Sequence, residues 1–311
     1  MSSQIVHHPV MCKEVIEFLA IRENGVYVDA TLGLGGHSEA ILSRLGTEGR
    51  LIGIDRDEEA LRIAKERLND MRVSFIKGEY SDIAELVRGL GVSTVDGILI
   101  DMGTSMHQLK SSERGFGFDA DFRLDMRMDQ SQDKSAWDIV NNYSILELQN
   151  ILKDYGQEPR YRAIVKAIDR YRQASAINTC KELSSLILRV YGGRGKRHPA
   201  TKTFQALRIA VNDEFNALNC VLKASPEILS HGGRLCVISY HSLEDRAVKH
   251  FFRDKGKDGS FKVLTDKPLR PTLEEIRRNK SARSAMLRAG ERWELHPQTP
   301  QGIKVNEYDK D

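Results

Sequence analysis

One stretch of the chain decides the fold: Thr31-Leu-Gly-Leu-Gly-Gly-His-Ser-Glu-Ala40, which holds three glycines and a histidine. It follows residues 26–29 (VYVD), which read as a strand, and precedes residues 41–45 (ILSRL), which read as a helix. A glycine turn between a strand and a helix lets a ligand approach the free backbone N–H groups at the helix start. The sequence therefore predicts a β-α unit built around a ligand site.

The first hundred residues continue this alternation of strand and helix patterns. The expected strands are residues 26–29, 51–55, 73–77 and 97–101, with helices up to residue 45, over 58–68 and over 82–90 between them. Such alternation predicts right-handed β-α-β units, and so an α/β fold with a mostly parallel sheet covered by helices on both faces. A ligand in such a sheet lies beyond the carboxyl ends of the strands, where the glycine turn, Asp55 and Asp101 all fall.

A long segment interrupts the sheet pattern. The next expected strand, residues 233–240, begins about 130 residues after Asp101, whereas a β-α-β unit needs only about 30 residues. We therefore expect a sheet domain in two pieces, 1–109 and 213–311, with an inserted subdomain over 110–212.

The insertion reads as helical. Ser144 with Glu147 and Thr179 with Glu182 fit the capping box, in which a hydroxyl and a carboxylate satisfy free amide donors at a helix start. A longer apolar stripe over 204–222 predicts one helix that returns the chain to the sheet.

The C-terminal part is expected to complete the sheet. After the strand at 233–240 a helix should begin, capped by Ser242 with Asp245 three residues on. Short apolar groups at 261–264 and 284–287 predict edge strands.

Composition sets broad limits. Lys and Arg number 47 against 44 Asp and Glu, a net charge of +3, so total charge favours no class of partner. No charged segment followed by an apolar one stands at the start, and no run of 18 apolar residues occurs, so we expect a soluble cytoplasmic protein without a membrane segment. Four cysteines without Cys-x-x-Cys spacing argue against a disulfide framework or a zinc site: Cys12, Cys180, Cys220 and Cys236.

Basic residues gather in two segments. Residues 183–212 carry six and no acidic residue, and residues 267–288 carry seven against two glutamates. Such patches can follow a phosphate backbone, because each neutralised phosphate releases counterions. They also suit an ordinary solvated surface, and the pattern alone leaves both interpretations open.

The glycine turn is compatible with more than one cofactor. A dinucleotide turn of the form Gly-x-Gly-x-x-Gly would need a glycine where this chain has Ser38. Asp55 ends the second strand, where a carboxylate can accept hydrogen bonds from the ribose of either NAD or S-adenosylmethionine. His37 is placed to donate to a ligand carboxylate or to pack over the turn.

Beyond these patterns, ordered blocks along nearly the whole chain resemble the ribosomal RNA small subunit methyltransferase H family. They include His8-Pro-Val-Met11, Thr31-x-Gly-x-Gly-Gly-His37, Gly53-Ile-Asp-Arg56, Asp96-Gly-Ile-Leu-Ile-Asp-Met-Gly103, Glu113-Arg-Gly-Phe116, Leu124-Asp-Met-Arg-Met-Asp129, Gly232-Gly-Arg-Leu235 and His241-Ser-Leu-Glu-Asp-Arg246. Tyr80 and Tyr240 stand where phenylalanine is usual in that family.

The resemblance implies a class I, Rossmann-like methyltransferase with a helical insertion for RNA recognition. It implies transfer of a methyl group from S-adenosylmethionine to the exocyclic N4 amine of a cytidine in the decoding (P-site) region of 16S rRNA, with the small ribosomal subunit as partner. The cofactor residues that it implies are Gly35, Gly36, His37, Asp55, Tyr80, Asp101 and Gln108.

The chemistry requires a proton acceptor and a face on which the base can stack. We expect Asp101 and His241 to be catalytic and Tyr240 or Phe116 to offer the stacking face, with residues 114–127 as a lid or as an ordinary salt-bridged loop. The expected RNA contacts are Arg194, Lys196, Arg197, Lys202 and Arg208.

Two other functions share parts of this pattern. A nicotinamide-dependent oxidoreductase would use the same sheet and ribose carboxylate, but it predicts the third glycine and gives no reason for the basic insertion. A non-catalytic RNA-binding ribosome assembly factor predicts a damaged pocket, whereas the expected cofactor residues are all present.

Overall fold

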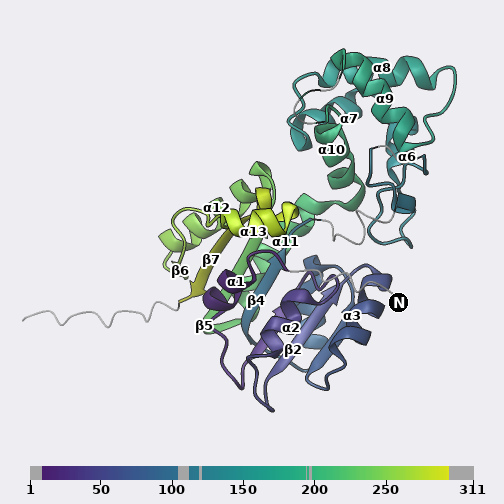
Figure 1. The fold of residues 1–311 in the computed structure, drawn as a ribbon. Coiled ribbons are helices and arrows are strands. Elements are labelled where there is room, and N and C mark those ends of the chain that lie inside the picture. The colour runs from purple at the N-terminus through teal and green to yellow at the C-terminus, as the bar shows by residue number, and fades with distance from the viewer. Residues whose placement is uncertain (1–8, 104–111, 119–120, 194, 196–197, 294–311) are drawn as a thin grey trace, which may run out of the picture.

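The fold is a seven-stranded sheet with strand order β3-β2-β1-β4-β5-β7-β6 (Figure 1). The computed structural model describes residues 9–103, 112–118, 121–193, 195 and 198–293. The strands are β1 (Val26–Asp29), β2 (Arg50–Asp55), β3 (Val73–Lys77), β4 (Val95–Asp101), β5 (Leu229–Ser239), β6 (Phe261–Val263) and β7 (Met286–Arg292). Strands β1 to β5 pair in parallel, whereas β7 is antiparallel to both β5 and β6, which confirms the predicted mostly parallel sheet.

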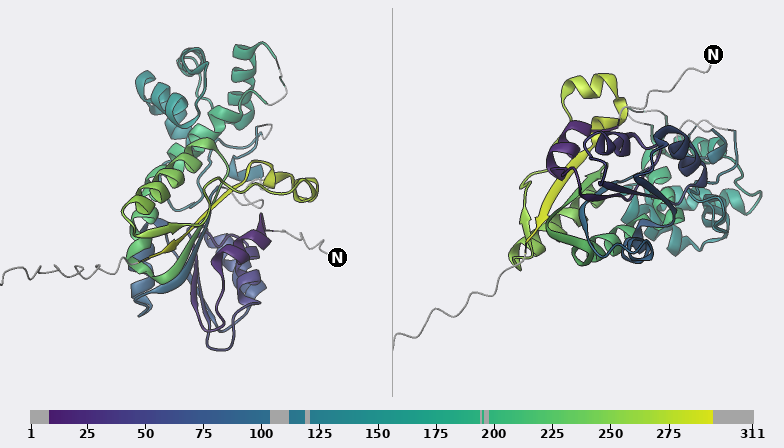
Figure 2. Two further views of the ribbon diagram at one scale, coloured as in Figure 1. Left: turned by 90° about the vertical axis from the view of Figure 1, so that its left-hand side faces the viewer. Right: turned by 90° about the horizontal axis from the view of Figure 1, so that it is seen from below.

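Helices cover both faces of the sheet (Figure 2). One face carries η1 (Tyr80–Asp82), α4 (Ile83–Gly89), α11 (Glu214–Ile228) and α12 (Ser242–Lys257). The other carries α1 (Cys12–Leu19), α2 (Gly36–Leu42), α3 (Glu58–Leu68) and η4 (Lys280–Ser284), while α13 (Leu273–Arg278) precedes η4.

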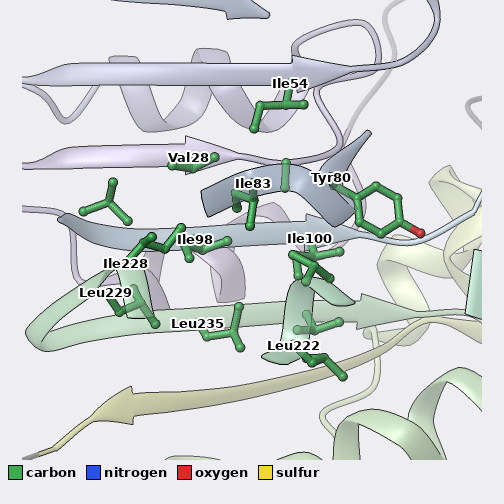
Figure 3. Close-up of a cluster of buried hydrophobic side chains, with 14 of the residues drawn as sticks. Val28, Ile54, Tyr80, Ile83, Ile98, Ile100, Leu222, Ile228, Leu229 and Leu235 are labelled. Carbon is green, nitrogen blue, oxygen red and sulfur yellow. The ribbon is translucent and has the colours of Figure 1, made fainter. Parts of the chain in front are cut away.

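The central strands are apolar because both of their faces are buried. Figure 3 shows Val28, Ile98, Ile100 and Leu235 in one cluster with Leu222 of α11. Each such side chain contributes about 1.5–3 kcal/mol on burial, so this cluster holds the strand ends in fixed positions. The functional side chains that follow these strands therefore stand on a rigid support.

The inserted segment has a hydrophobic core of its own, formed by residues between Phe116 and Val211. Its elements are η2 (Ser112–Arg114), α6 (Ala136–Asn142), α7 (Ile145–Asn150), the π-helical turn η3 (Ile151–Tyr155), α8 (Tyr161–Arg172), α9 (Cys180–Tyr191) and α10 (Thr201–Asn212). Figure 1 shows helices α6 to α10 as a lobe apart from the sheet. The capping boxes predicted at Ser144 and Thr179 are both present.

The long helix expected over 204–222 is two helices, so that prediction is wrong. Asp213 ends α10 and precedes α11 with φ +48°, in the left-handed region that Asp tolerates better than most residues. The side chain of Asn212 explains the break: it donates to the Met126 carbonyl and accepts from the Met128 N–H, each at 2.8 Å. These bonds tie the end of α10 to a neighbouring loop.

Two C-terminal predictions also need correction. Helix α12 is capped by His241 with Glu244, one residue earlier than the expected Ser242 and Asp245. Strand β7 pairs on both sides, between β5 and β6, so of these two strands β6 lies at the sheet edge and β7 does not. Within the described residues no helix is both long and apolar enough to cross a bilayer.

Candidate active site

A cavity of about 450 Å³ lies at the carboxyl ends of the strands, as predicted. Its walls come from the glycine turn, from Asp55 at the end of β2, from Asp101 at the end of β4, and from Tyr240 and His241 just before α12. Helix α10 and the loop before α6 close the side opposite the sheet with aromatic and methionine side chains. The insertion therefore forms part of the site.

The glycine turn brings backbone groups to the cavity. Gly33 has φ +51°, and its N–H donates to Asp55 Oδ2 at 2.7 Å. Gly33 and Gly36 line the cavity, whereas Gly35 has φ +78° and faces away from it, so that a Cβ there would lie 3.1 Å from Leu68 of α3. Gly35 thus allows α2 and α3 to pack closely, and its predicted cofactor contact stays a prediction.

Asp55 is held by two backbone donors and faces the cavity. In addition to the Gly33 bond, its Oδ1 accepts from the Asp57 N–H at 2.8 Å. Burial raises the pKa of Asp55 to about 6, although both backbone donors act in the opposite direction. A carboxylate fixed in this way keeps further lone pairs for ligand hydroxyls.

His37, Asp101 and Tyr240 form a group on the cavity wall. His37 Nε2 lies 3.6 Å from Asp101 Oδ2, and the Tyr240 hydroxyl donates to Asp101 Oδ1 at 2.9 Å. Burial opposes the charge on His37, but Asp101, the Cys12 thiol and Asp29 raise its pKa to about 10. These neighbours favour the protonated form of His37, and neither of its ring nitrogens has a hydrogen bond within the described part of the chain.

His241 also lines the cavity, but its ring is turned toward Glu244. Its Nδ1 accepts from the Glu244 N–H at 3.4 Å, and its Nε2 lies 2.9 Å from Glu244 Oε1. Burial would raise the pKa of Glu244, but His241 and Arg208 together lower it. The histidine predicted to be catalytic is thus also the cap of α12.

Arg208 lies in the cavity wall, in an ion pair that the sequence did not reveal. Its Nε and a terminal nitrogen donate to both carboxylate oxygens of Glu214 at 2.8 and 2.9 Å. Tyr80, which burial keeps un-ionised by raising its pKa, points its hydroxyl to the Glu214 carbonyl at 3.5 Å. The sequence could have predicted the pair of Arg208 and Glu214 only if the break between α10 and α11 at Asp213 had been known.

The segment predicted as a lid is anchored by Arg114. This arginine is buried and donates to Asp57 Oδ2 at 2.9 Å and to the Met128 carbonyl at 2.8 Å. Side chains of the segment line the cavity, among them Phe116 and Phe118. The interpretation as a salt-bridged loop is thus confirmed for Arg114, and movement of the segment as a lid stays a prediction.

Of the predicted RNA contacts outside the cavity, Lys202 is the one that the structure describes. It is exposed, and its Nζ donates to the Gln157 carbonyl at 2.8 Å. The other predictions, Gln108 for the cofactor and Arg194, Lys196 and Arg197 for RNA, lie outside the described residues.

Comparison with known proteins decides the family. A sequence profile of the MraW methylase family matches residues 4–293. The chain belongs to the MraW methylase family. The ribosomal RNA small subunit methyltransferase H of Dictyoglomus turgidum is 46% identical over 94% of this chain and 99% of its own length. The protein of the same name from Coprothermobacter proteolyticus is 45% identical over 93% of this chain and 96% of its own.

Membership of the MraW methylase family confirms three predictions: the class I methyltransferase fold, the methyltransferase activity and S-adenosylmethionine as the methyl donor. It also excludes the alternative of a nicotinamide-dependent oxidoreductase. Among the described residues, no group of three or more His, Cys, Asp and Glu side chains is arranged to hold a metal ion.

The cavity fits this cofactor. Asp55 can take the ribose hydroxyls, and the ring of His37, which is buried without a hydrogen bond and favoured in its protonated form, suits the carboxylate of the methionine part. Ser38 stands where a pyrophosphate-binding turn has its third glycine, and its hydroxyl donates to buried Asp29 at 2.7 Å. The turn is thus shaped for a cofactor without phosphate.

Proposed function

We propose that this chain methylates the exocyclic N4 amine of a specific cytidine in the decoding (P-site) region of 16S rRNA, within the small ribosomal subunit in the cytoplasm. The names of its curated relatives support ribosomal RNA of the small subunit as the substrate class. The observation that best supports this reaction is the position of Asp101, which faces the cavity between the glycine turn and the start of α12.

Asp101 has the geometry of a proton acceptor. The lone pair of a cytosine amine is delocalised into the ring, so the nitrogen must be held in place and must lose a proton as it forms its new bond. S-adenosylmethionine supplies, when bound, an electrophilic methyl group. Asp101 has one oxygen bonded to Tyr240 and the other 3.6 Å from His37, which leaves lone pairs that can accept from the amine.

His241 is less well placed to accept a proton. Its Nδ1 lone pair is directed to the Glu244 N–H, so its Nε2 carries the proton and faces Glu244 Oε1. In this arrangement neither nitrogen has a lone pair directed at a substrate. We therefore favour Asp101 as the acceptor and give His241 a role in shaping the pocket.

The target base must leave its stack to reach Asp101, at a cost of a few kcal/mol. Rings on the insertion side of the cavity can offset this cost by stacking: Phe116, Phe118 and Phe204 all line it. Phe118 is itself held in place, since it packs edge-on against Phe204 at 5.0 Å and stacks on His198 at 4.7 Å.

A methyl-transfer assay tests the proposal. Small ribosomal subunits from a strain that lacks the enzyme should take up one labelled methyl group, and mass spectrometry should find it on N4 of a cytidine in the decoding region. Label on another base or another atom would refute the proposed position. Absence of label, with RNA binding retained, would instead favour a non-catalytic assembly factor.

A matched pair of variants tests the assignment of the proton acceptor. Asp101→Asn keeps the size of the side chain but removes its charge, and should lower kcat by about 10²- to 10⁴-fold. His241→Gln should lower kcat much less. A larger loss in His241→Gln than in Asp101→Asn would reverse the assignment.

A further inference from the structure

A second hollow lies on the outer surface, between α11 and α12. It has a volume of about 530 Å³, similar to that of the main cavity, and side chains of both helices line it. None of the lining residues is acidic, and four are Lys, Arg or His: Lys223, Arg246, His250 and Lys255. We call this hollow the α11/α12 groove.

The cations of the groove are available to an external anion. Lys223, Arg246 and His250 are exposed, and none of them forms an ion pair within the described residues. The neighbouring carboxylates are engaged elsewhere: Glu227 with Arg88, Asp245 with Arg288 and Asp254 with Arg253. Lys255 alone is paired, with Asp258 at 3.4 Å.

The two helices that line the groove begin at the active site. Helix α11 begins with Glu214 and α12 follows His241, and both of these residues line the main cavity. The rings of Phe215 and His241 meet there at 5.9 Å. Each turn carries α12 about 5.4 Å further from the cavity, so its cations form a line that leads away from the site.

We propose that the α11/α12 groove binds the sugar-phosphate backbone of the single-stranded rRNA segment adjoining the target base. This inference rests on the proposed function and adds the path of the substrate. Unpaired cations along a concave track, with the ring of Phe251 in its wall, are the combination that single-stranded nucleic acid recognises. An ordinary solvated helix surface would carry charges of both signs, whereas the lining of this groove has none that is negative.

The double variant K223A/R246A tests the groove. Both side chains are exposed and lie outside the catalytic cavity, so the fold and the affinity for S-adenosylmethionine should be unchanged. The RNA probe is a transcript of the decoding region of 16S rRNA, with binding measured by fluorescence anisotropy between 50 and 200 mM salt. Loss of two single-strand phosphate contacts should lower the slope of log affinity against log salt by about 1.4.

Three further measurements make the test specific. The variant K223R/R246K keeps both charges and should keep the wild-type slope. The control K13A/R44A removes two exposed cations from the opposite face of the sheet and should change nothing. In methyl transfer, K223A/R246A should raise KM for the RNA and leave kcat at saturation within about twofold, because binding is lost equally from ground and transition states.

The outcomes separate this inference from the proposed function. Suppose that the wild type methylates the RNA and that K223A/R246A has the salt slope and KM of the wild type. The groove is then not the RNA path, and the proposed function stands. If K13A/R44A lowers the salt slope as much as K223A/R246A does, the effect is one of total charge, which also overturns the inference. If the wild type binds the RNA without methylating it, the proposed function fails, whereas a lowered slope in K223A/R246A still supports the groove.

Discussion

Asp55 links cofactor binding to pH. Burial raises its pKa to about 6, and only the ionised form accepts hydrogen bonds from both ribose hydroxyls. Affinity for S-adenosylmethionine should therefore rise with pH up to about 6 and level off above it, being about tenfold weaker at pH 5 than at pH 8. Calorimetric titration at several pH values measures this. Asp55→Asn should bind weakly at every pH, and a wild-type affinity independent of pH would contradict the role of Asp55.

The Tyr240 hydroxyl holds Asp101 by a hydrogen bond to Oδ1, whereas His37 lies nearer to Oδ2. Tyr240→Phe removes only the hydroxyl that donates at 2.9 Å and should lower the free energy of unfolding by about 1 kcal/mol. Urea denaturation measures the change. Tyr155→Phe is the matched control, because the Tyr155 hydroxyl makes no hydrogen bond within the described residues. Equal stability of the two variants would show that the bond to Asp101 contributes nothing measurable.

The sequence predicted the positions of single site residues at strand ends, but it did not predict ion pairs between residues of different helices. Asp55 and Asp101 end apolar strands, and that position alone places them at the carboxyl edge of a parallel sheet. Glu214 gave no such signal, because its pairing with Arg208 depends on the turn at Asp213.

At the level of elements, Arg114 fastens the loop before α6 to the start of α3. Arg114 and Asp57 are both buried, so Arg114→Ala leaves a carboxylate without its main partner and should cost about 3 kcal/mol of unfolding free energy. Urea denaturation of Arg114→Ala, Asp57→Asn and the double variant should show strong coupling. Arg62→Ala, which breaks an exposed pair with Glu66, should cost less than about 1 kcal/mol. If Arg114→Ala lowered the free energy of unfolding no more than Arg62→Ala does, Arg114 would not anchor the loop.

Helix boundaries show where local sequence signals stop. Capping boxes at Ser144 and Thr179 are complete within four residues, and the structure has both. The break at Asp213 arises from hydrogen bonds between Asn212 and a loop more than eighty residues earlier, which no local pattern carries. Helix α12 is capped by His241 and not by Ser242, because an imidazole nitrogen, like a hydroxyl, can accept a backbone N–H, here that of Glu244.

The sheet domain and the insertion are packed around separate hydrophobic clusters, and residues of both line the active site. Alternating strand and helix patterns predicted the sheet domain, and the long gap between strands predicted the insertion. Phe116 of the insertion was expected at the cavity, but Phe204 and Met128 were not, since they reach the site only through tertiary packing. The glycine turn thus belongs to the sheet domain, whereas the opposite wall of the cavity belongs to a separately packed lobe.

Removal of the insertion tests whether the sheet domain alone binds the cofactor and the insertion is needed for the RNA substrate. A variant with residues 1–109 and 213–311 joined by a flexible Gly/Ser linker keeps the sheet, the glycine turn, Asp55 and Asp101. Because the sheet domain has its own core, the variant should fold and still bind S-adenosylmethionine, with affinity weakened by loss of the insertion side of the cavity. It should transfer no methyl group to small subunits, since the aromatic wall for the target base is gone. Circular dichroism and calorimetric titration measure the first two properties, and full-length Asp101→Asn serves as a folded, poorly active control. A variant that does not fold would show that the two cores form one cooperative unit, and one that still methylates rRNA would show that the insertion is not the substrate lobe.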